Sequence, residues 1–184
     1  GGAAGPAGPA SGEGAEGVIR VLNVISDTNI GGAGRVILNY LRYADSSRFE
    51  TWVAVPKGSL LKEPLEEAGA RVLEVDGMAD RSYHKEDVKA LKELLRRERP
   101  DLVHTHGALS GRVAARQCGV PVVYSRHSAF PVPAKLRYPP GRWVNKWLNE
   151  HYADRIIAVS PATAENLTDG GISPKKITIV MNGV

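Results

Sequence analysis

Two apolar runs of this chain are each followed by a short polar sequence that contains histidine. The run 101–103 is followed by His104-Thr105-His106-Gly107, and the run 120–124 by Ser125-Arg126-His127-Ser128. If both runs are strands of one parallel sheet, their carboxyl ends meet at the edge where open α/β sheets hold ligands. The histidines are therefore the first candidates for chemistry, as hydrogen-bonding, proton-transferring or metal-ligating groups.

His127 is the strongest candidate, because it comes just after the second run. The cations Arg126 and Lys135 are expected to favour its neutral form, and a neutral imidazole can exchange a hydrogen bond with a sugar hydroxyl. Arg126 and Ser128 are weaker candidates for the wall of the same crevice. The alternative is that His127 is an ordinary loop histidine.

His104 and His106 raise the question of a metal site. No third ligand stands at a telling spacing, Asp101 lies at the other end of the run, and we do not expect the two rings to point to the same side. Zinc sites need three or four protein ligands, so no metal is predicted. We expect His104 to be a packed histidine with a hydrogen-bond partner, and His106, in the loop, to line the crevice.

A glycine-rich loop, Gly31-Gly32-Ala33-Gly34, precedes a predicted helix. Glycines permit positive φ and close backbone approach, and a helix N-terminus offers free amides to an anion. A dinucleotide site is disfavoured, because Ile37 occupies the place of the third fingerprint glycine and Val55-Pro56-Lys57 stands where an acid is expected. The sequence G-x-x-x-x-G-K-[ST] is not present either. We expect Gly31 and Gly32 to approach a phosphate or a sugar; a plain turn is the alternative.

Alternating strands and helices must position these residues. Continuous apolar runs are typical of parallel strands buried on both faces, and they alternate with helical patterns about seven times. This predicts an α/β fold with a doubly wound, Rossmann-like parallel sheet of about seven strands in the order 3-2-1-4-5-6-7. The predicted strands are 18–25, 50–55, 70–75, 101–103, 120–124, 155–159 and 177–180, and the helices are 35–43, 60–68, 85–99, 111–118, 142–152 and 162–168.

Size and composition limit the class of protein. The 184 residues suffice for one α/β core, which we expect to span residues 18–184. Residues 1–17 contain only Gly, Ala, Pro, Ser and Glu and predict a disordered leader, native or added. The net charge of +4 is too small and dispersed to indicate a nucleic-acid partner. The single cysteine excludes an internal disulfide and fits a cytoplasmic protein.

The segment 135–152 combines cations with Trp143 and Trp147. Such a segment can touch an anionic membrane surface, which would make the protein membrane-peripheral. Two tryptophans on one helical face are more often part of the core, and this is the interpretation we favour.

The ordered set of motifs resembles the N-terminal domain of family 4 retaining glycosyltransferases, which have the GT-B fold. The resemblance is carried by the glycine loop, by PDLVHTHG, by GVPVVYSRH, and by ADRIIAVSPATAENL followed by ISPKKITIVMNGV. These stretches run in the family order from about Val18 to the end of the chain. No counterpart of the family's donor-binding C-terminal domain is present in the sequence.

The resemblance implies what the protein binds and does. The full-length enzyme would transfer a sugar from a nucleotide-diphosphate sugar to a carbohydrate or lipid-linked acceptor, with retention and without a metal or other cofactor. Gly31 and Gly32 would approach the donor phosphate and position the acceptor, and His127 would contact the donor sugar. The C-terminal domain would be a partner, and the present chain alone would be inactive. The alternatives are another GT-B enzyme, such as a nucleotide-sugar epimerase, and a non-enzymatic flavodoxin-like binding module.

Overall fold

A seven-stranded, all-parallel sheet in the order β3-β2-β1-β4-β5-β6-β7 organises the chain, as the sequence predicts. The computed structural model describes residues 17–182, so the predicted leader lies almost entirely outside the described residues. The strands are β1 (Ile19–Ile25), β2 (Phe49–Pro56), β3 (Arg71–Val75), β4 (Leu102–His106), β5 (Val122–Arg126), β6 (Arg155–Ala158) and β7 (Ile177–Ile179).

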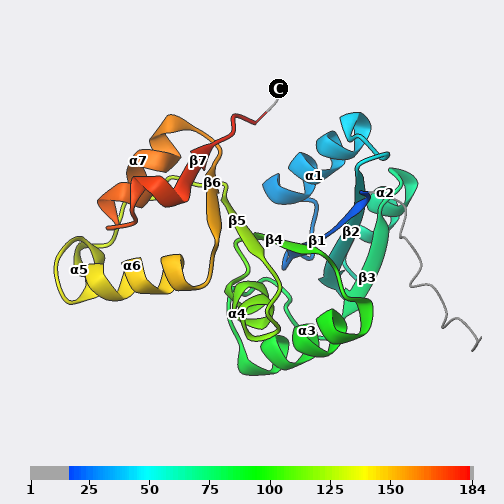
Figure 1. Cartoon of the computed structure of the whole chain (residues 1–184), viewed down its shortest axis with the longest axis horizontal. Helices are drawn as coiled ribbons and strands as arrows, with labels where there is room; N and C mark the ends of the chain where they lie inside the picture. The colour runs from blue at the N-terminus through cyan, green and yellow to red at the C-terminus, as the bar shows by residue number, and fades with distance from the viewer. Residues whose placement is uncertain (1–16, 183–184) are drawn as a thin grey trace, which may run out of the picture.

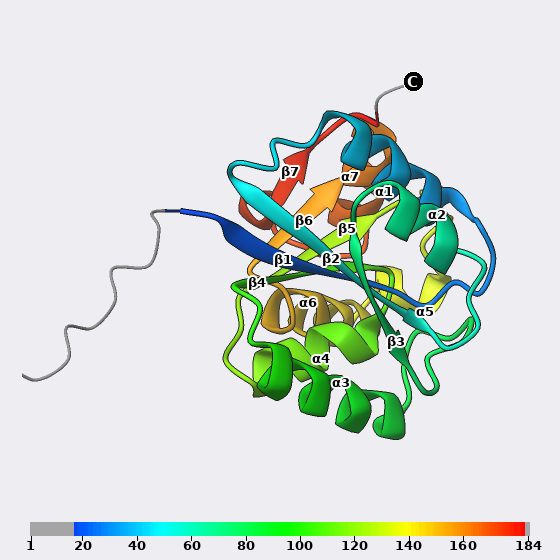
Figure 2. The same cartoon turned by 90° about the vertical axis from the view of Figure 1, so that its right-hand side faces the viewer.

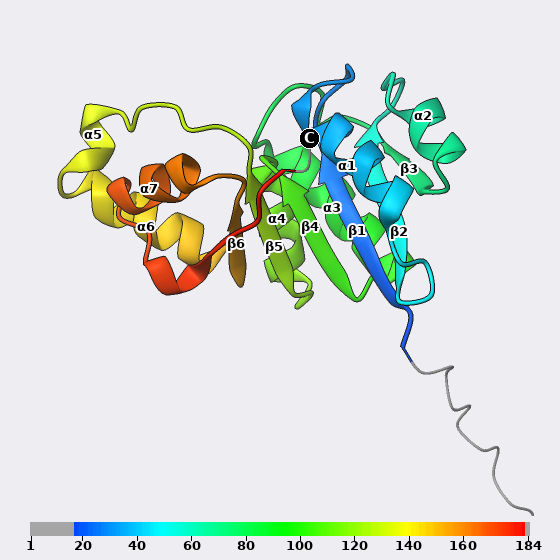
Figure 3. The ribbon, with the colours of Figure 1, turned by 90° about the horizontal axis from the view of Figure 1, so that it is seen from above.

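Helices cover the two faces of the sheet unevenly (Figures 1 and 2). Their bounds are α1 (Gly32–Tyr43), α2 (Lys62–Glu67), α3 (Lys85–Glu98), α4 (Leu109–Gln117), α5 (Ala134–Arg137), α6 (Gly141–His151) and α7 (Pro161–Asp169). One face of β1–β3 packs on α1 and α2, and the opposite face of the sheet packs on α3 and α4. Seen from above, α5, α6 and α7 form a separate group beyond β6 (Figure 3).

The core follows from the alternation of side chains along each strand. In β2, Val53 and Val55 pack with Ile37 of α1, whereas Trp52 and Ala54 belong to the cluster that contains α3 and α4. A third, smaller cluster joins β5 and β6 to α7 and consists of Tyr124, Ala153, Ile156, Ala158, Leu167 and Ile172. Most buried apolar side chains therefore lie around β1–β4.

The helix ends have local causes. Ser160 caps α7, because its Oγ accepts a hydrogen bond from the Thr163 amide at 3.1 Å, and Pro161 occupies the first turn, as predicted. His84 caps α3 through Nδ1, which accepts from the Glu86 amide at 3.3 Å. Helix α1 begins at Gly32, three residues earlier than predicted, so the glycine sequence is the first turn of the helix rather than a loop before it.

Candidate active site

The sheet register brings together the polar residues that follow β4 and β5. His106 is paired with Ser125 across β4 and β5, and Asn23 of β1 is paired with His104 of β4. Residues two apart on a strand share a face. Asn23, His104, His106 and Ser125 therefore lie on one face of the sheet, and His127 follows β5 on the same side.

Hydrogen bonds link three of these side chains in a row. His106 Nδ1 lies 2.8 Å from His127 Nε2, and His106 Nε2 lies 3.1 Å from Asn23 Oδ1. The rings of His106 and His127 are stacked, with their centroids 5.1 Å apart. His127 Nδ1 is buried and has no hydrogen-bond partner. The row therefore ends on a nitrogen to which the described residues give no hydrogen-bond partner.

Two expectations for the first histidine pair were wrong. His106 is the last residue of β4 and is only 6% exposed, so it does not lie in the loop. Its ring lies 4.3 Å from that of His104, because β4 continues through both residues and positions i and i+2 share a face. His104 itself is a packed histidine with a partner, as expected: its Nε2 lies 2.7 Å from Ser125 Oγ.

Burial keeps the three imidazoles neutral near pH 7. Desolvation, helped by the positive charge that His127 would carry, lowers the pKa of His104 to about 4. Desolvation also lowers the pKa of His106 well below its ordinary value, with further contributions from His104 and His127. The pKa of His127 is lowered by desolvation. The direction for His127 agrees with the sequence analysis, but the cause is burial rather than the cations Arg126 and Lys135.

A cavity of about 660 Å³ extends along this face of the sheet. Its floor includes Asn23, His104, His106, Ser125 and His127, its walls come from α1 and from the segment after β7, and the remaining lining is largely apolar. Pockets of this size hold small organic ligands, with a few polar groups fixing their orientation. The two histidines predicted for the crevice, His106 and His127, both line it.

The glycines lie outside this cavity lining and differ from each other. Gly31 precedes α1 with φ −87°, and neither it nor Gly32 has the positive φ that the sequence analysis allowed for. A Cβ added to Gly32 would meet nothing within 4 Å, whereas one added to Gly31 would lie 2.9 Å from Asp27 Oδ2. Burial, together with Asp80, raises the pKa of Asp27. While ionised, this carboxylate disfavours an anion close to Gly31.

Arg126 and Ser128 are held in contacts of their own. The Arg126 Nε donates to the Ser128 carbonyl at 3.1 Å, and its Nη2 donates to Asn166 Oδ1 of α7, also at 3.1 Å. Arg126 thus points away from the face that carries Ser125 and His127, as alternation along β5 requires. Neither Arg126 nor Ser128 lines the cavity. Within residues 17–182, no three His, Cys, Asp or Glu side chains are grouped so as to hold a metal ion.

Asn23 is the site residue that sequence reasoning missed. It is 5% exposed and lies in β1 between apolar residues, Val21 and Leu22 before it and Val24 and Ile25 after it. Its Nδ2 donates to the Trp52 carbonyl at 3.4 Å and its Oδ1 faces His106. A single amide inside an apolar strand is a usable signal, because a buried polar group needs a partner.

The segment 135–152 contradicts the prediction that its tryptophans are in the core. Tyr138, Trp143, Val144 and Trp147 are 71%, 66%, 61% and 56% exposed, and we call these four residues the aromatic face. The inward side of α6 is polar: Asn149 is buried, and Asn145 donates to the Gly170 carbonyl at 2.7 Å. No helix among the described residues is long and apolar enough to cross a membrane.

Several solved structures have the same architecture as this chain. A glycosyltransferase from Rickettsia africae superposes with a TM-score of 0.72 at 18% identity, over 91% of this chain and 44% of its own. Anabaena HepE, solved with UDP and glucose, gives 0.67 at 18% identity over 90% and 45%. The UDP-GlcNAc 2-epimerase of Neisseria meningitidis gives 0.54 at 17% identity over 89% and 46%. The chain thus has the Rossmann-like architecture of one half of a GT-B structure.

The sequence shows the family to which the chain belongs. Glycosyltransferase Family 4 matches residues 30–184, and the chain belongs to this family. It is also 27% identical, over 165 residues, to the Escherichia coli UDP-Gal:alpha-D-GlcNAc-diphosphoundecaprenol alpha-1,3-galactosyltransferase. That match covers 84% of this chain and 42% of the relative. The chain therefore spans less than half the length of the relatives it matches.

Proposed function

We propose that this chain is the N-terminal domain of a cytoplasmic enzyme that transfers a sugar from a nucleotide-diphosphate sugar to an acceptor hydroxyl with retention and without a metal. The family supports glycosyl transfer. The observation that carries the site is the hydrogen-bonded pair of His106 and His127, at the carboxyl ends of neighbouring strands and open to a cavity of about 660 Å³. The acceptor is a carbohydrate or a lipid-linked carbohydrate, as the name of the E. coli relative suggests.

His127 is the catalytic residue of the proposal. Its neutral ring presents a buried, unpartnered Nδ1, which accepts a hydrogen bond from a hydroxyl of the donor sugar and holds the reacting carbon in place. His106 forms part of the crevice wall, and Arg126 and Ser128 support the loop that carries His127. In the proposed whole enzyme a C-terminal domain supplies most of the donor site, so the 184-residue chain alone does not turn over.

The first turn of α1 is the proposed site of donor approach. Its early amides have no partner within the helix and can bind a phosphate. Gly32 faces open space, which lets a ligand come close to the backbone. Beside Gly31 the Asp27 carboxyl favours a hydroxyl over an anion, which suits acceptor positioning at that end of the loop.

The experiment for His127 uses the full-length protein and a screen of nucleotide sugars, with product configuration read by NMR. We expect His127→Ala to lower kcat by roughly tenfold to a thousandfold, with little change in KM. The melting temperature should fall only modestly, because the ring is only half-buried and His106 keeps its hydrogen bond to Asn23. Normal kcat in the variant would remove His127 from the catalytic role. Activity lost to a chelator and restored by magnesium would refute the metal-independent mechanism.

Substitutions at two glycines of α1 give a test of phosphate binding and its matched control. Gly32→Val adds a side chain where the protein leaves room, so turnover should fall without loss of stability. Gly34→Ala is the structural control, since its Cβ would overlap the Leu61 side chain, and it should lower stability instead. Full turnover of Gly32→Val would reduce the glycine sequence to a simple helix start.

The epimerase alternative rests on the shared fold. It separates cleanly from transfer, because an epimerase converts the nucleotide sugar without any acceptor. Incubation of the full-length protein with donor alone distinguishes the two: a changed sugar configuration on the nucleotide supports epimerisation. A binding module without catalysis would give saturable ligand binding and no product in either assay.

We also propose that the segment 135–152 contacts an anionic membrane surface. The aromatic face is exposed beside Lys135, Arg137 and Lys146, which are exposed as well. Aromatic and cationic side chains together suit the headgroup region of anionic lipid. Vesicles containing phosphatidylglycerol should bind the chain, and pure phosphatidylcholine vesicles should not. The double change Trp143→Ser and Trp147→Ser should abolish binding, whereas Tyr83→Ser, at an exposed tyrosine outside the segment 135–152, should not.

A further inference from the structure

The hydrogen bonds behind His127 determine which of its two nitrogens carries the proton. The row begins at the Trp52 carbonyl, which can only accept, so the Asn23 Nδ2 faces it as a donor at 3.4 Å. The Asn23 Oδ1 is thereby directed at His106 Nε2, 3.1 Å away. An amide oxygen also can only accept, so His106 must carry its proton on Nε2.

The same reasoning passes through His106 to His127. His106 is almost fully buried between two other imidazoles, so it is neutral and has only one N–H. With that proton on Nε2, its Nδ1 is a bare acceptor. The facing nitrogen, His127 Nε2 at 2.8 Å, must then be the donor. A neutral His127 with its proton on Nε2 leaves Nδ1 without one.

We infer that Asn23 and His106 are positioning residues that lock His127 in its Nε2–H tautomer, so that its buried, unpartnered Nδ1 serves only as an acceptor for a ligand hydroxyl. His127 Nδ1 has no partner in the chain, and an acceptor there selects a hydroxyl or another N–H or O–H group over a carbonyl or phosphate oxygen. Only the identity of the hydroxyl, as one of the donor sugar, rests on the proposed function. The tautomer itself follows from the chain.

Long-range 1H–15N NMR of the 15N-labelled 184-residue chain at pH 7.5 tests the tautomers directly, since protonated and bare ring nitrogens differ widely in shift. In the unaltered chain, His106 and His127 should each show a protonated Nε2 and a bare Nδ1. Asn23→Leu removes the acceptor that favours a proton on His106 Nε2, so the tautomer ratio of both rings should shift at least tenfold toward a protonated Nδ1. Asn23→Asp keeps an acceptor and should retain the original tautomers.

Ser125→Ala is the control, because it removes the partner of His104 and leaves the row intact. It should leave the tautomers of His106 and His127 unchanged. A protonated Nδ1 on His127 in the unaltered chain would overturn the inference, and this result needs no variant to fold. Unchanged tautomers in a folded Asn23→Leu variant would overturn the role of Asn23.

Turnover of the full-length protein is the second readout. Asn23→Leu should lower kcat roughly tenfold or more with KM nearly constant, as a histidine in the wrong tautomer loses its function, and Asn23→Asp should restore most of it. A merely structural role would predict loss in both variants. If the tautomer is locked in the unaltered chain but His127→Ala has normal activity, the proposed function is refuted. If the tautomer is not locked and His127→Ala has low activity, only the positioning role is refuted.

Discussion

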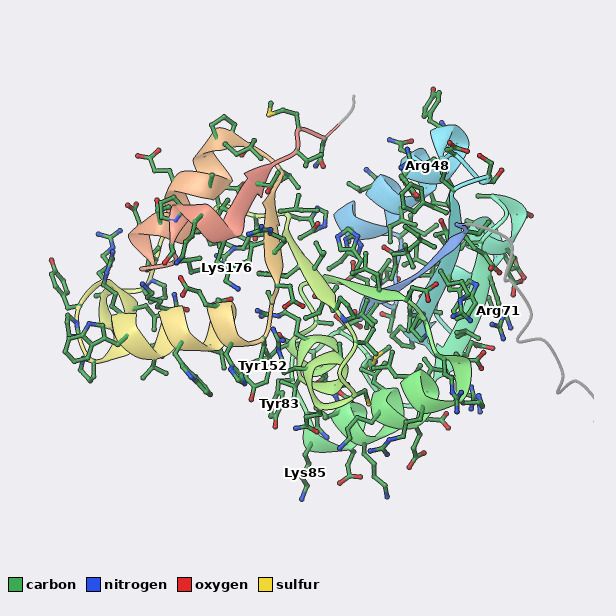
Figure 4. All side chains as sticks on the ribbon, viewed as in Figure 1. Arg48, Arg71, Tyr83, Lys85, Tyr152 and Lys176 are labelled. Atoms are coloured by element: carbon green, nitrogen blue, oxygen red, sulfur yellow. The ribbon has the colours of Figure 1, made fainter. Side chains whose placement is uncertain are left out.

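The two ends of the sheet are built on different principles. Around β1–β4, helices α1 to α4 press apolar side chains onto both faces. Helix α3 buries Val88, Leu91, Leu94 and Leu95, and of its charged side chains only Asp87, paired with Arg81, is buried with them. Beyond β5, α6 does the reverse, with Asn149 inside and its tryptophans outside. Lys176, before β7, reaches back to the end of α6 (Figure 4): its Nζ donates to the Glu150 carbonyl at 3.5 Å and to the Ala153 carbonyl, just after the helix, at 3.2 Å.

The two ends differ in whether the chain buries the apolar surface of its own helices. An apolar helix face gains stability by burial against its own sheet, whereas polar anchors such as Asn145 and Asn149 fix a helix in place and contribute less. The aromatic face, on α6 and the residues just before it, is therefore a surface whose apolar area this chain leaves exposed. The histidine site lies at the junction of β4 and β5, between the two ends.

Lowering the pH should have the largest effect on the stability of the chain, through the histidines at the junction of β4 and β5. The pKa values of His104 and His106 are depressed in the folded chain, so the unfolded chain binds protons first as the pH falls. The stability from neutral histidine is complete above about pH 6.5 and is lost as the pH falls toward about 4. Between pH 7 and 5 the shift of His104 alone should lower the free energy of unfolding by roughly 2 kcal/mol, and the depressed pKa of His106 should add to this loss.

Urea unfolding at pH 7, 6 and 5 measures this loss. The window is chosen because the carboxylates with lowered pKa, such as Asp101 and Glu74, lose their contribution only below their ordinary values of 3.8 and 4.5. His104→Gln should remove the His104 part of the pH dependence and leave the part that comes from His106 and His127. A free energy of unfolding that is flat across the window would show that the histidines are not buried in neutral form.

Leu91→Ala tests the apolar end of the comparison. Leu91 is 1% exposed in the cluster beneath α3, and removing a buried leucine side chain costs about 2–5 kcal/mol through lost burial and the cavity left behind. Chemical denaturation gives the value. Leu60→Ala, at a position 64% exposed, is the control and should change little. A loss below about 1 kcal/mol for Leu91→Ala would mean that this end is not tightly packed.

Sequence reasoning reached the fold but only part of the site. Strand order follows from apolar runs and short crossovers, so β1 to β7 were found in sequence order and in the correct spatial order. The contact between His106 and His127 depends on the β4–β5 register, which a sequence does not state. Asn23 was missed because its partner is 83 residues away. Trp143 and Trp147 were placed in the core because hydrophobicity alone does not say which side of α6 meets the sheet.

Asn149→Ala tests the polar anchor of α6. The Asn149 Oδ1 accepts from Arg112 Nη1 at 3.1 Å, and the Arg112 guanidinium is buried against the Tyr124 ring. Truncation leaves part of a buried cation without its acceptor, which should cost about 1.5–3 kcal/mol. Arg112→Met with Asn149→Ala should recover part of the loss, because the cation is gone. If the double variant is no more stable than Asn149→Ala alone, the cation is not the cause.

A pair of tryptophans gives the smallest expected effect and the sharpest contrast. Trp147 is 56% exposed, and its ring pairs with that of His151 on the same helix at 5.1 Å and with that of Tyr152, just after the helix, at 5.9 Å. Trp147→Ala removes little buried area, so the free energy of unfolding should change by less than about 1 kcal/mol. Trp52→Ala is the matched control: Trp52 is 4% exposed, lies under Arg71, and should cost about 3–5 kcal/mol.

Thermal and urea unfolding of the two variants side by side decide the point. The outward orientation of α6 requires a large difference between them, because the same residue type is removed from a filled core in one case and from an exposed face in the other. Equal losses would mean that Trp147 is packed in solution, either against this chain or against a second copy, and a concentration-dependent midpoint would identify the second copy. A midpoint that does not depend on concentration would mean that this chain itself packs Trp147.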